Sequence, residues 1–406
     1  MPNISTSNSN QIYKYVAQIT TTFKNDQSPT TIDQLRFKSI IVDYNYDEYN
    51  FPLIYCNVNI PLEWIEKLVA NQKTGTLVFT LQKYVENSDM PGLRVDVINE
   101  ECIYFMPSDD AKDYERAYNE DKTEDIGLNV TIGLISLTHI NAIKKVRHGC
   151  IKSGTMSSIL YYLLNGHTLL IEPLKYNPKL NNFVLPAINS LSKMVKYLNN
   201  YQVFYDTQYR FFIDFGVTYL LSSSGKGVKK KGDQTNKVKF VLWNEYEERN
   251  MEGMNYTIDS GMYTIDCSGS YSVLSETSDS SASFSSITGV GTVGAKQKSV
   301  STGMREKESP IYQKTNYIRI PNNNTGLIDN MTSSAANNAR VLSIAKNKID
   351  TSIVSVNKEF YVDASRVYGE EYSGTYLLSR KRELYKPEGE GFAMSLLLSL
   401  KRVANQ

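Results

Sequence analysis

The sequence predicts an α+β fold that is mainly β, with its helices gathered in the middle of the chain. Two observations predict this class. Over most of residues 11–148, and again from residue 238 onward, apolar and polar side chains alternate with the period of two that half-buried strands require. Between about residues 150 and 221 the apolar residues recur three and four positions apart, as on the buried face of a helix.

Residues 1–148 are predicted to form a first β-domain, for which a small barrel is one candidate form. The clearest alternating sets are Tyr13, Tyr15, Ala17 and Ile19, then Leu77, Phe79 and Leu81, then Leu128, Val130, Ile132 and Leu134. One helix is expected to interrupt these strands. Asn59 is its candidate cap, Pro61 suits its first position, and its apolar stripe is Leu62, Ile65, Leu68 and Val69. The acidic stretch 109–125 is predicted to be a long exposed loop.

Residues 149–221 are predicted to form an α+β module. Thr155 is a candidate N-cap for a helix that carries Ile159, Leu160 and Leu163 on one face and stops at Asn165-Gly166. A short buried strand, "HTLLIEP", follows, and a second helix is expected from about 186 to 199. The strands "QVFYD" and "YRFFIDF", joined around Thr207-Gln208, and then "VTYLLS" complete the module.

Residues 222–406 are predicted to form a second β-domain, with a Ser/Gly-rich insertion at about 268–333. Its strands are expected at "VKFVLW", "MNYTID", "MYTIDC", "EFYVDA" and "GTYLLS". Residues 268–303 are dominated by Ser, Thr and Gly, which cannot bury enough surface to offset their ordering entropy, so a neighbouring chain is expected to hold this segment. Residues 333–349 are predicted to be a helix, with Ala336, Ala339, Leu342 and Ile349 among its apolar positions.

A well-marked hairpin closes the chain between Tyr376 and Leu400. The turn Pro387-Glu388-Gly389-Glu390-Gly391 separates two strand-like runs. In the last run Phe392, Met394, Leu396, Leu398 and Leu400 point one way, and Leu397 is the exception on the other face. This hairpin is expected to close the second β-domain.

The composition excludes several classes of protein. A chain of 406 residues is long enough for two or three domains, and a net charge of +1 gives no overall signature of polyanion binding. Its 29 tyrosines suit half-buried sheet faces and protein contacts. The polar N-terminus is not a signal peptide, and the apolar region 126–143 is too often interrupted by polar residues to cross a bilayer.

No residue is assigned a catalytic, cofactor-binding or metal-binding role. The cysteines Cys56, Cys102, Cys150 and Cys267 lie far apart and are expected to be reduced and mostly buried. His139 is placed on a strand among Leu and Ile, where a core or surface histidine is usual. No histidine lies near a serine or cysteine nucleophile signature, so no enzyme is predicted.

Two glycine-rich stretches imitate phosphate-binding motifs. "GVGTVGA", Gly289 to Ala295, spells GxGxxG, but no buried strand leads into it and no amphipathic helix follows, so a flexible loop is predicted. "GKGVKKKGD", Gly225 to Asp233, lacks the Gly-Lys-Ser/Thr ending of a phosphate loop. It is predicted to be a solvated hairpin tip between "TYLLSSS" and "VKFVLW", with a basic surface that could meet an acidic partner or a nucleic-acid backbone.

The stretch from "GHTLLIEP" through "SLSKMVKYL" to "YRFFIDF" and "YLLS" resembles the central module of phage tail hub proteins. The C-terminal "YSGTYLLSRKRELYKPEGEGFAMSLLLSLKR" is similar to the closing strands of the second barrel in that family. The chain therefore resembles baseplate hub proteins of tailed phages, akin to the hub part of type VI secretion spike proteins. The insertion near 268–333 departs from the family pattern, and a chain that stops at Gln406 implies a spike on a separate chain.

The resemblance implies two small tube-like β-barrels with an intervening α+β module, and no cofactor. It implies a homotrimer whose pseudo-sixfold ring joins the sixfold tail tube to the threefold spike and leaves a channel for DNA. Expected partners are the tube or distal tail protein, the spike, the tape-measure protein and the wedge proteins. The expected location is the virion, after synthesis in the host cytoplasm. Two alternatives stay open: a peripheral adaptor that links wedge or fibre proteins to the core, and a tail-associated cell-wall hydrolase.

Overall fold

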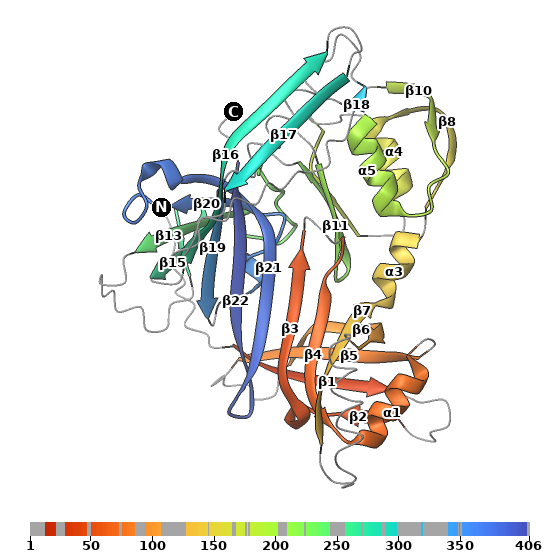
Figure 1. Cartoon of the computed structure of the whole chain (residues 1–406), viewed down its shortest axis with the longest axis vertical. Helices are drawn as coiled ribbons and strands as arrows, with labels where there is room; N and C mark the ends of the chain where they lie inside the picture. The colour runs from red at the N-terminus through yellow and green to blue at the C-terminus, as the bar shows by residue number, and fades with distance from the viewer. Residues whose placement is uncertain are drawn as a thin grey trace.

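The computed structural model describes residues 13–21, 29–46, 50–72, 75–85, 94–106, 127–144, 146–164, 168–174, 177, 179–201, 209–222, 225–243, 256–268, 271–285, 290–298, 318–319, 340–347, 349 and 351–403. The predicted loop at 109–125, the helix stop at 165–166 and the strand "QVFYD" with its turn lie outside these residues. The described chain is mainly β, as predicted, with a small helical part (Figure 1). No helix among the described residues is long and apolar enough to span a membrane.

Eight strands close into a barrel. They are β1 (Tyr13–Thr21), β3 (Phe37–Asn45), β4 (Leu53–Ile60), β5 (Thr76–Val85), β6 (Val95–Phe105), β7 (Leu128–Ser136), β21 (Gly374–Glu388) and β22 (Gly391–Arg402). The antiparallel ladders run around the ring in the order β1, β5, β6, β7, β4, β3, β21, β22 and back to β1. Tyr15 opposite Phe392 makes the closing contact between β22 and β1. A closed ring leaves no unpaired sheet edge.

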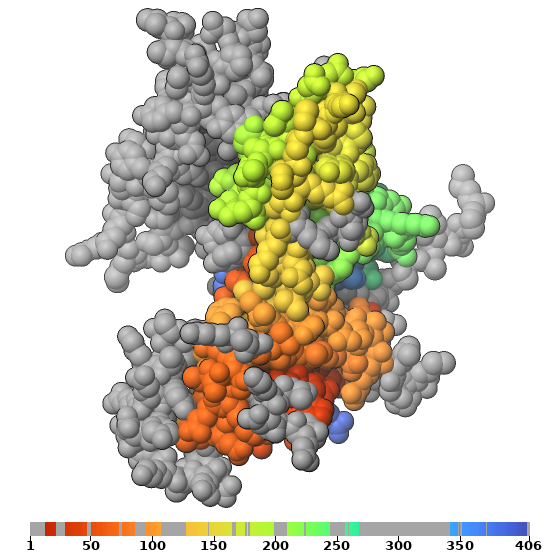
Figure 2. Space-filling view, turned by 90° about the vertical axis from the view of Figure 1, so that its right-hand side faces the viewer, coloured from red at the N-terminus to blue at the C-terminus, as the bar shows by residue number. Residues whose placement is uncertain are grey.

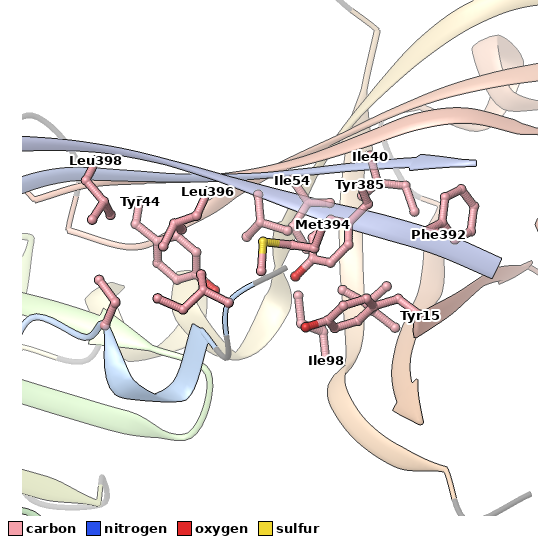
Figure 3. Close-up of a cluster of buried hydrophobic side chains, with 14 of the residues drawn as sticks. Tyr15, Ile40, Tyr44, Ile54, Ile98, Tyr385, Phe392, Met394, Leu396 and Leu398 are labelled. Atoms are coloured by element: carbon pink, nitrogen blue, oxygen red, sulfur yellow. The ribbon is translucent and has the colours of Figure 1, made fainter. Parts of the chain in front are cut away.

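The interior of the barrel is filled by the residues that the alternating pattern selected. Tyr15, Ala17, Ile19, Leu77, Phe79, Leu81, Val130, Ile132 and Leu134 are all buried. The hairpin β21–β22 adds Tyr385, Phe392, Met394 and Leu396 to the same core (Figure 3). Leu397, the exception in the sequence pattern, is 41% exposed on the outer face. The alternation therefore predicted the inward faces correctly.

The C-terminal hairpin also carries a second β-unit. β21 pairs with β20 (Glu359–Asp363), β20 pairs in parallel with β13 (Lys237–Trp243), and β13 with β15 (Met262–Ser268), which also holds β14 (Thr257–Asp259). On its other side, β22 pairs with β19 (Arg340–Asn347) and β19 with β16 (Tyr271–Ser285), followed by β17 (Val290–Lys298) and β18 (Ile318–Arg319). The sequence assigned this hairpin to the second β-domain, but it closes the first barrel as well.

The middle of the chain forms a separate layer with its own core. It contains α3 (Leu137–Lys144), β8 (Gly149–Thr155), α4 (Met156–Leu163), β9 (Leu169–Ile171), β10 (Lys179–Leu185), α5 (Leu191–Tyr201), β11 (Tyr209–Asp214) and β12 (Val217–Ser222). Its apolar residues, among them Leu160, Met194 and Leu220, pack in a cluster distinct from the barrel core. Figure 2 shows this module, in yellow and yellow-green, above the orange N-terminal barrel.

Helix starts were predicted with mixed success. The Thr155 side chain accepts a hydrogen bond from the Ser158 N–H and caps α4, as expected. α1 (Leu62–Asn71) begins after Pro61, and Asn59 does not cap it. The Asn59 amide instead donates to the Gly127 carbonyl and to Asn129, at 3.0 Å each, because β4 continues through this position to Ile60.

The helix predicted for residues 333–349 is wrong where the structure describes it. Residues Arg340–Asn347 form β19, with Leu342 and Ile344 buried between β22 and β16. The spacing of Ala336, Ala339, Leu342 and Ile349 fits a helix. The two-residue spacing of Leu342 and Ile344 fits a strand equally well. Residues 340–347 form a strand because β22 and β16 both pair with it.

"GVGTVGA" is likewise not a loop where it is described. Val290–Lys298 forms β17, which pairs antiparallel with β16 from Val290 opposite Ser285 to Lys298 opposite Glu276. No helix N-terminus follows these glycines, since the strand continues through Ala295. The geometry of a dinucleotide site is therefore not formed here.

Candidate functional site

The turn between β11 and β12 joins the middle module to the barrel. Phe215 and Gly216 form this turn, and Gly216 adopts a φ of +76°, which a residue without a side chain accepts readily. The backbone of Asn50, at the start of the barrel strand β4, accepts a hydrogen bond of 2.7 Å from the Ile213 N–H. The Asn50 amide in turn donates to the Phe211 carbonyl at 3.0 Å. These two bonds fix the module against the barrel.

Aromatic side chains from both parts pack together at this junction. Tyr44 and Tyr46, at the end of β3, contact Phe212 and Phe215 from the module. The rings of Tyr46 and Phe212 have centroids 4.5 Å apart and lie edge to face, a favoured geometry. Burial raises the pKa of both tyrosines well above 10. The cluster joins the core of the barrel to that of the module.

A buried ion pair lies inside the barrel just below this cluster. Lys381 and Glu383, neighbours on the inner face of β21, form a salt bridge of 3.0 Å, and their side chains are 6% and 2% exposed. The Lys381 ammonium also lies 4.0 Å from the ring centroid of Tyr44, and the Tyr385 hydroxyl donates to Glu383 at 2.8 Å. Burial, followed by the charge of Glu383, raises the pKa of Tyr385. Each charge thus has partners, as buried charges require.

His139 lies at the same junction but on a helix. The sequence placed it on a strand, yet β7 ends at Ser136 and His139 belongs to the first turn of α3. Its ring packs between Phe51 and Phe215, at centroid distances of 6.2 and 5.3 Å. Neither ring nitrogen forms a hydrogen bond of standard geometry with a described residue, and the nearby Asp214 backbone only partly offsets the effect of burial on the pKa. Burial lowers the pKa of this histidine to about 4.

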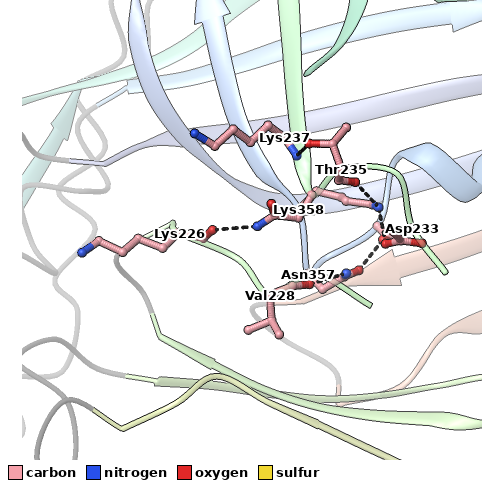
Figure 4. A network of polar contacts seen from close by, with 9 residues as sticks. Lys226, Val228, Asp233, Thr235, Lys237, Asn357 and Lys358 are labelled. Atoms are coloured by element: carbon pink, nitrogen blue, oxygen red, sulfur yellow. Dashed lines mark hydrogen bonds and ion pairs between the residues drawn. The ribbon is translucent and has the colours of Figure 1, made fainter. Parts of the chain in front are cut away.

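The basic stretch 225–236 is not a hairpin tip. β12 belongs to the small sheet with β9 and β11, whereas β13 belongs to the large sheet, so residues 225–236 cross from one sheet to the other. Val228 exchanges backbone and side-chain hydrogen bonds with Asn357, at 2.7 and 2.8 Å (Figure 4). The buried ammonium of Lys358 pairs with Asp233 at 2.5 Å and donates to the Thr235 carbonyl at 3.1 Å. The linker formed by residues 225–236 is therefore held to the rest of the protein by hydrogen bonds and an ion pair.

The outer face of the shared hairpin carries charged side chains that are partly exposed. Asp43 on β3 forms ion pairs there with Arg380 and Arg382 on β21. Exposed apolar side chains lie on the same β-units: Leu397 on β22, Tyr361 on β20 and Val78 on β5 are each 39–41% exposed. Such side chains on strands are suited to contacts with another protein.

A protein-family model with the description "Bacteriophage PBS1 gene 109 protein" matches residues 9–403. The chain belongs to this family. The match covers nearly the whole chain, including the insertion that the sequence resemblance did not lead us to expect. No curated protein matches the chain.

Solved structures similar to this gene 109 family member are tail and secretion proteins. A tail protein from Neisseria meningitidis MC58 has 8% identity and a TM-score of 0.46, with 96% of each chain covered. The 43 kDa tail protein of prophage MuSo2 from Shewanella oneidensis has 7% identity and a TM-score of 0.44, again with 96% of each chain covered. A type VI secretion component from E. coli, whose description states similarity to two T4 tail proteins, has 7% identity and a TM-score of 0.39, covering 94% of this chain and 76% of that one.

The sequence analysis assigned no catalytic, cofactor-binding or metal-binding residue in this gene 109 family member, so its predictions for single side chains concern the cysteines and histidines. The expectation of mostly buried free thiols is confirmed: Cys56, Cys102 and Cys267 are buried, and Cys150 is exposed. Burial raises the pKa of Cys102 and Cys267 to about 12, which keeps them protonated. Sequence reasoning missed the junction, because Tyr44, Tyr46 and Asn50 lie more than 160 positions before Phe211, Phe212 and Phe215 and no local pattern connects them.

Proposed function

We propose that the chain is a structural tail protein that acts as the central baseplate hub. Three copies would form a pseudo-sixfold ring that joins the tail tube to the tail spike and leaves a channel for DNA. In this proposal the chain has three parts, 1–148, 149–221 and 222–406, and the last part lends its final hairpin to the first. The role is mechanical, so we expect no enzymatic activity.

The shared hairpin is the observation that supports this proposal most. Because β21 and β22 take part in both β-units, each chain presents the two units as one connected body. Three such chains offer six β-units around an axis, which is what a threefold assembly needs to meet a sixfold tube. The chain's membership in a bacteriophage family agrees with a place in the virion.

The oligomeric state tests the ring. Light scattering on the purified full-length chain should give three times the mass of one chain, and negative-stain images should show rings. A chain that remains monomeric in the presence of its own tube and spike proteins would contradict the proposal. A map of the particle that places the chain away from the tail axis would favour the peripheral adaptor, and turnover of peptidoglycan by the isolated chain would favour the hydrolase.

A further inference from the structure

A cavity of about 400 Å³ lies at the mouth of the barrel. Its walls are the ends of β3, β5 and β6 and the middle of β21, and its cover is made by the β11–β12 turn, the linker 225–236 and the segment 351–357. Ligand pockets in proteins commonly have volumes of roughly 300–1,000 Å³ and commonly occupy the mouths of β-barrels. The place and size of this cavity are therefore those of a small-molecule site.

Three polar groups that line the cavity have unused hydrogen-bonding capacity. Tyr44 and Tyr219 are 4% and 5% exposed, and neither hydroxyl hydrogen bonds to any residue that the structure describes. The Asp214 carboxylate accepts one hydrogen bond, through Oδ1 from the Phe215 N–H at 2.7 Å. Its Oδ2 accepts none from the described part of the chain.

The three groups lie within electrostatic reach of one another. Burial is the main cause of the raised pKa values of Tyr44 and Tyr219, and the charge of Asp214 adds to both shifts. A molecule that hydrogen bonds to all three groups at once therefore gains most from this cavity.

The charges around the cavity favour a neutral ligand. Three lysines and four acidic residues line it among the described residues, and one of the four, Asp233, already pairs with Lys358. The remaining charges are equal in number, so a ligand of either net charge meets repulsion as well as attraction. The Lys381–Glu383 pair is satisfied internally and needs no further partner.

We propose that this cavity binds a small neutral molecule rich in hydroxyl groups, of the size of a mono- or disaccharide. The Tyr44 and Tyr219 hydroxyls and the Asp214 carboxylate would bond its hydroxyl groups, and the Phe215, Tyr44 and Tyr219 rings would cover its C–H faces. Exposed residues of the described chain, Val95, Asp96 and Lys230, lie at the open side and leave a path for entry. The inference does not depend on a role in a hub.

Saturation-transfer difference NMR on the full-length chain tests this site. The probes are glucose, N-acetylglucosamine and maltose at millimolar concentration, with glucuronate and arginine as anionic and cationic comparators. We expect saturation transfer to at least one neutral sugar and weaker transfer to both charged probes. Absence of transfer to all three sugars, or stronger transfer to arginine or glucuronate, would overturn the proposal.

Tyr219→Phe provides the matched variant, because it removes one hydroxyl and keeps the ring. It should weaken binding of the responding sugar about fivefold, since one net hydrogen bond is lost. Its melting temperature without sugar should not fall, because the hydroxyl has no partner to lose. Tyr361→Phe on the outer face of β20 is the control and should change neither quantity. Equal sugar binding by Tyr219→Phe and the unmodified chain would also overturn the assignment.

Discussion

Single residues of β22 show how strictly the barrel sorts side chains between its two faces. Leu396 and Leu398 are 1% and 0% exposed, whereas Leu397 between them is 41% exposed. A strand reverses its side chains at every step, so one position decides between core and solvent. The sequence alternation was sufficient to predict all three positions.

Leu396→Asp and Leu398→Asp are each expected to prevent folding of the chain. An unpaired carboxylate in the core costs about 3–5 kcal/mol, a large share of the stability of an ordinary domain. Leu397→Asp is the matched control on the same strand and should leave the cooperative urea unfolding transition in place. Circular dichroism measures the transition in all three variants. Normal folding of the Leu396 and Leu398 variants would show that this face is not buried.

His139 couples the stability of the junction to pH. Its pKa of about 4 in the folded state lies below the ordinary value of 6.5, because the buried ring resists protonation. The unfolded chain therefore takes up the proton first, and stability that is fully present above pH 6.5 is lost as the pH falls towards 4. The loss is about 3 kcal/mol at most.

His139→Phe should reduce this pH dependence and leave the aromatic packing with Phe51 and Phe215 in place. The measurement is the free energy of unfolding in urea at several pH values between 4 and 7. Carboxylates titrate in the same range, so the comparison with the unmodified chain isolates the histidine. His148→Gln, at an exposed position, should retain the full pH dependence. Identical slopes for the unmodified chain and His139→Phe would rule out this coupling.

At the scale of elements, local patterns identified most strands and failed where two partners compete. β1, β5, β7, β13, β15 and β22 were read from alternation, and α4 from its cap. β19 was predicted as a helix and the described part of "GVGTVGA" as a loop. Strand pairing is non-local, so ladders offered by β22 and β16 outweigh the local preference of these residues.

Two glycines of the linker 225–236 allow a test of whether the linker packs against residues 357–359. Gly227 adopts a φ of +64°, and a Cβ there would lie 2.4 Å from the Asn357 carbonyl oxygen, whereas Gly232, with a φ of +96°, faces open space. Gly232→Ala should cost about 1–2 kcal/mol from backbone conformation alone. Gly227→Ala should cost clearly more, because the backbone of residues 357–359 must also move. Thermal unfolding of both variants measures the difference, and equal losses would show that the linker is not packed there.

At the scale of the whole molecule, the first barrel depends on the last residues of the chain. Among the described ladders of the ring, β3 and β1 are connected to each other only through the hairpin. β21 pairs with β3, β22 pairs with β1, and the two hairpin strands pair with each other. Without the hairpin both strands present unpaired edges and the interior loses Tyr385, Phe392, Met394 and Leu396. We therefore expect that the N-terminal barrel does not fold independently of the hairpin.

A fragment of residues 1–148 is accordingly expected to aggregate or to lack a cooperative unfolding transition. Joining residues 374–403 to it through a flexible linker should restore a cooperative transition and a near-UV signal from the buried tyrosines. A version of the joined fragment that carries Leu396→Asp serves as the control and should fail. Independent folding of 1–148 would show that the barrel closes without the hairpin.

Side-chain patterns were enough to predict which faces of the strands are apolar, where the helical module lies and that residues 376–400 form a hairpin. These features follow from side-chain periodicity and turn chemistry, which act between residues close together in the chain. Local patterns could not show that the hairpin closes the N-terminal barrel, that β19 is a strand or that Tyr44, Asp214 and Tyr219 line one cavity. These features rest on pairings between distant segments, whose free energy depends on the partner surface as much as on the segment itself.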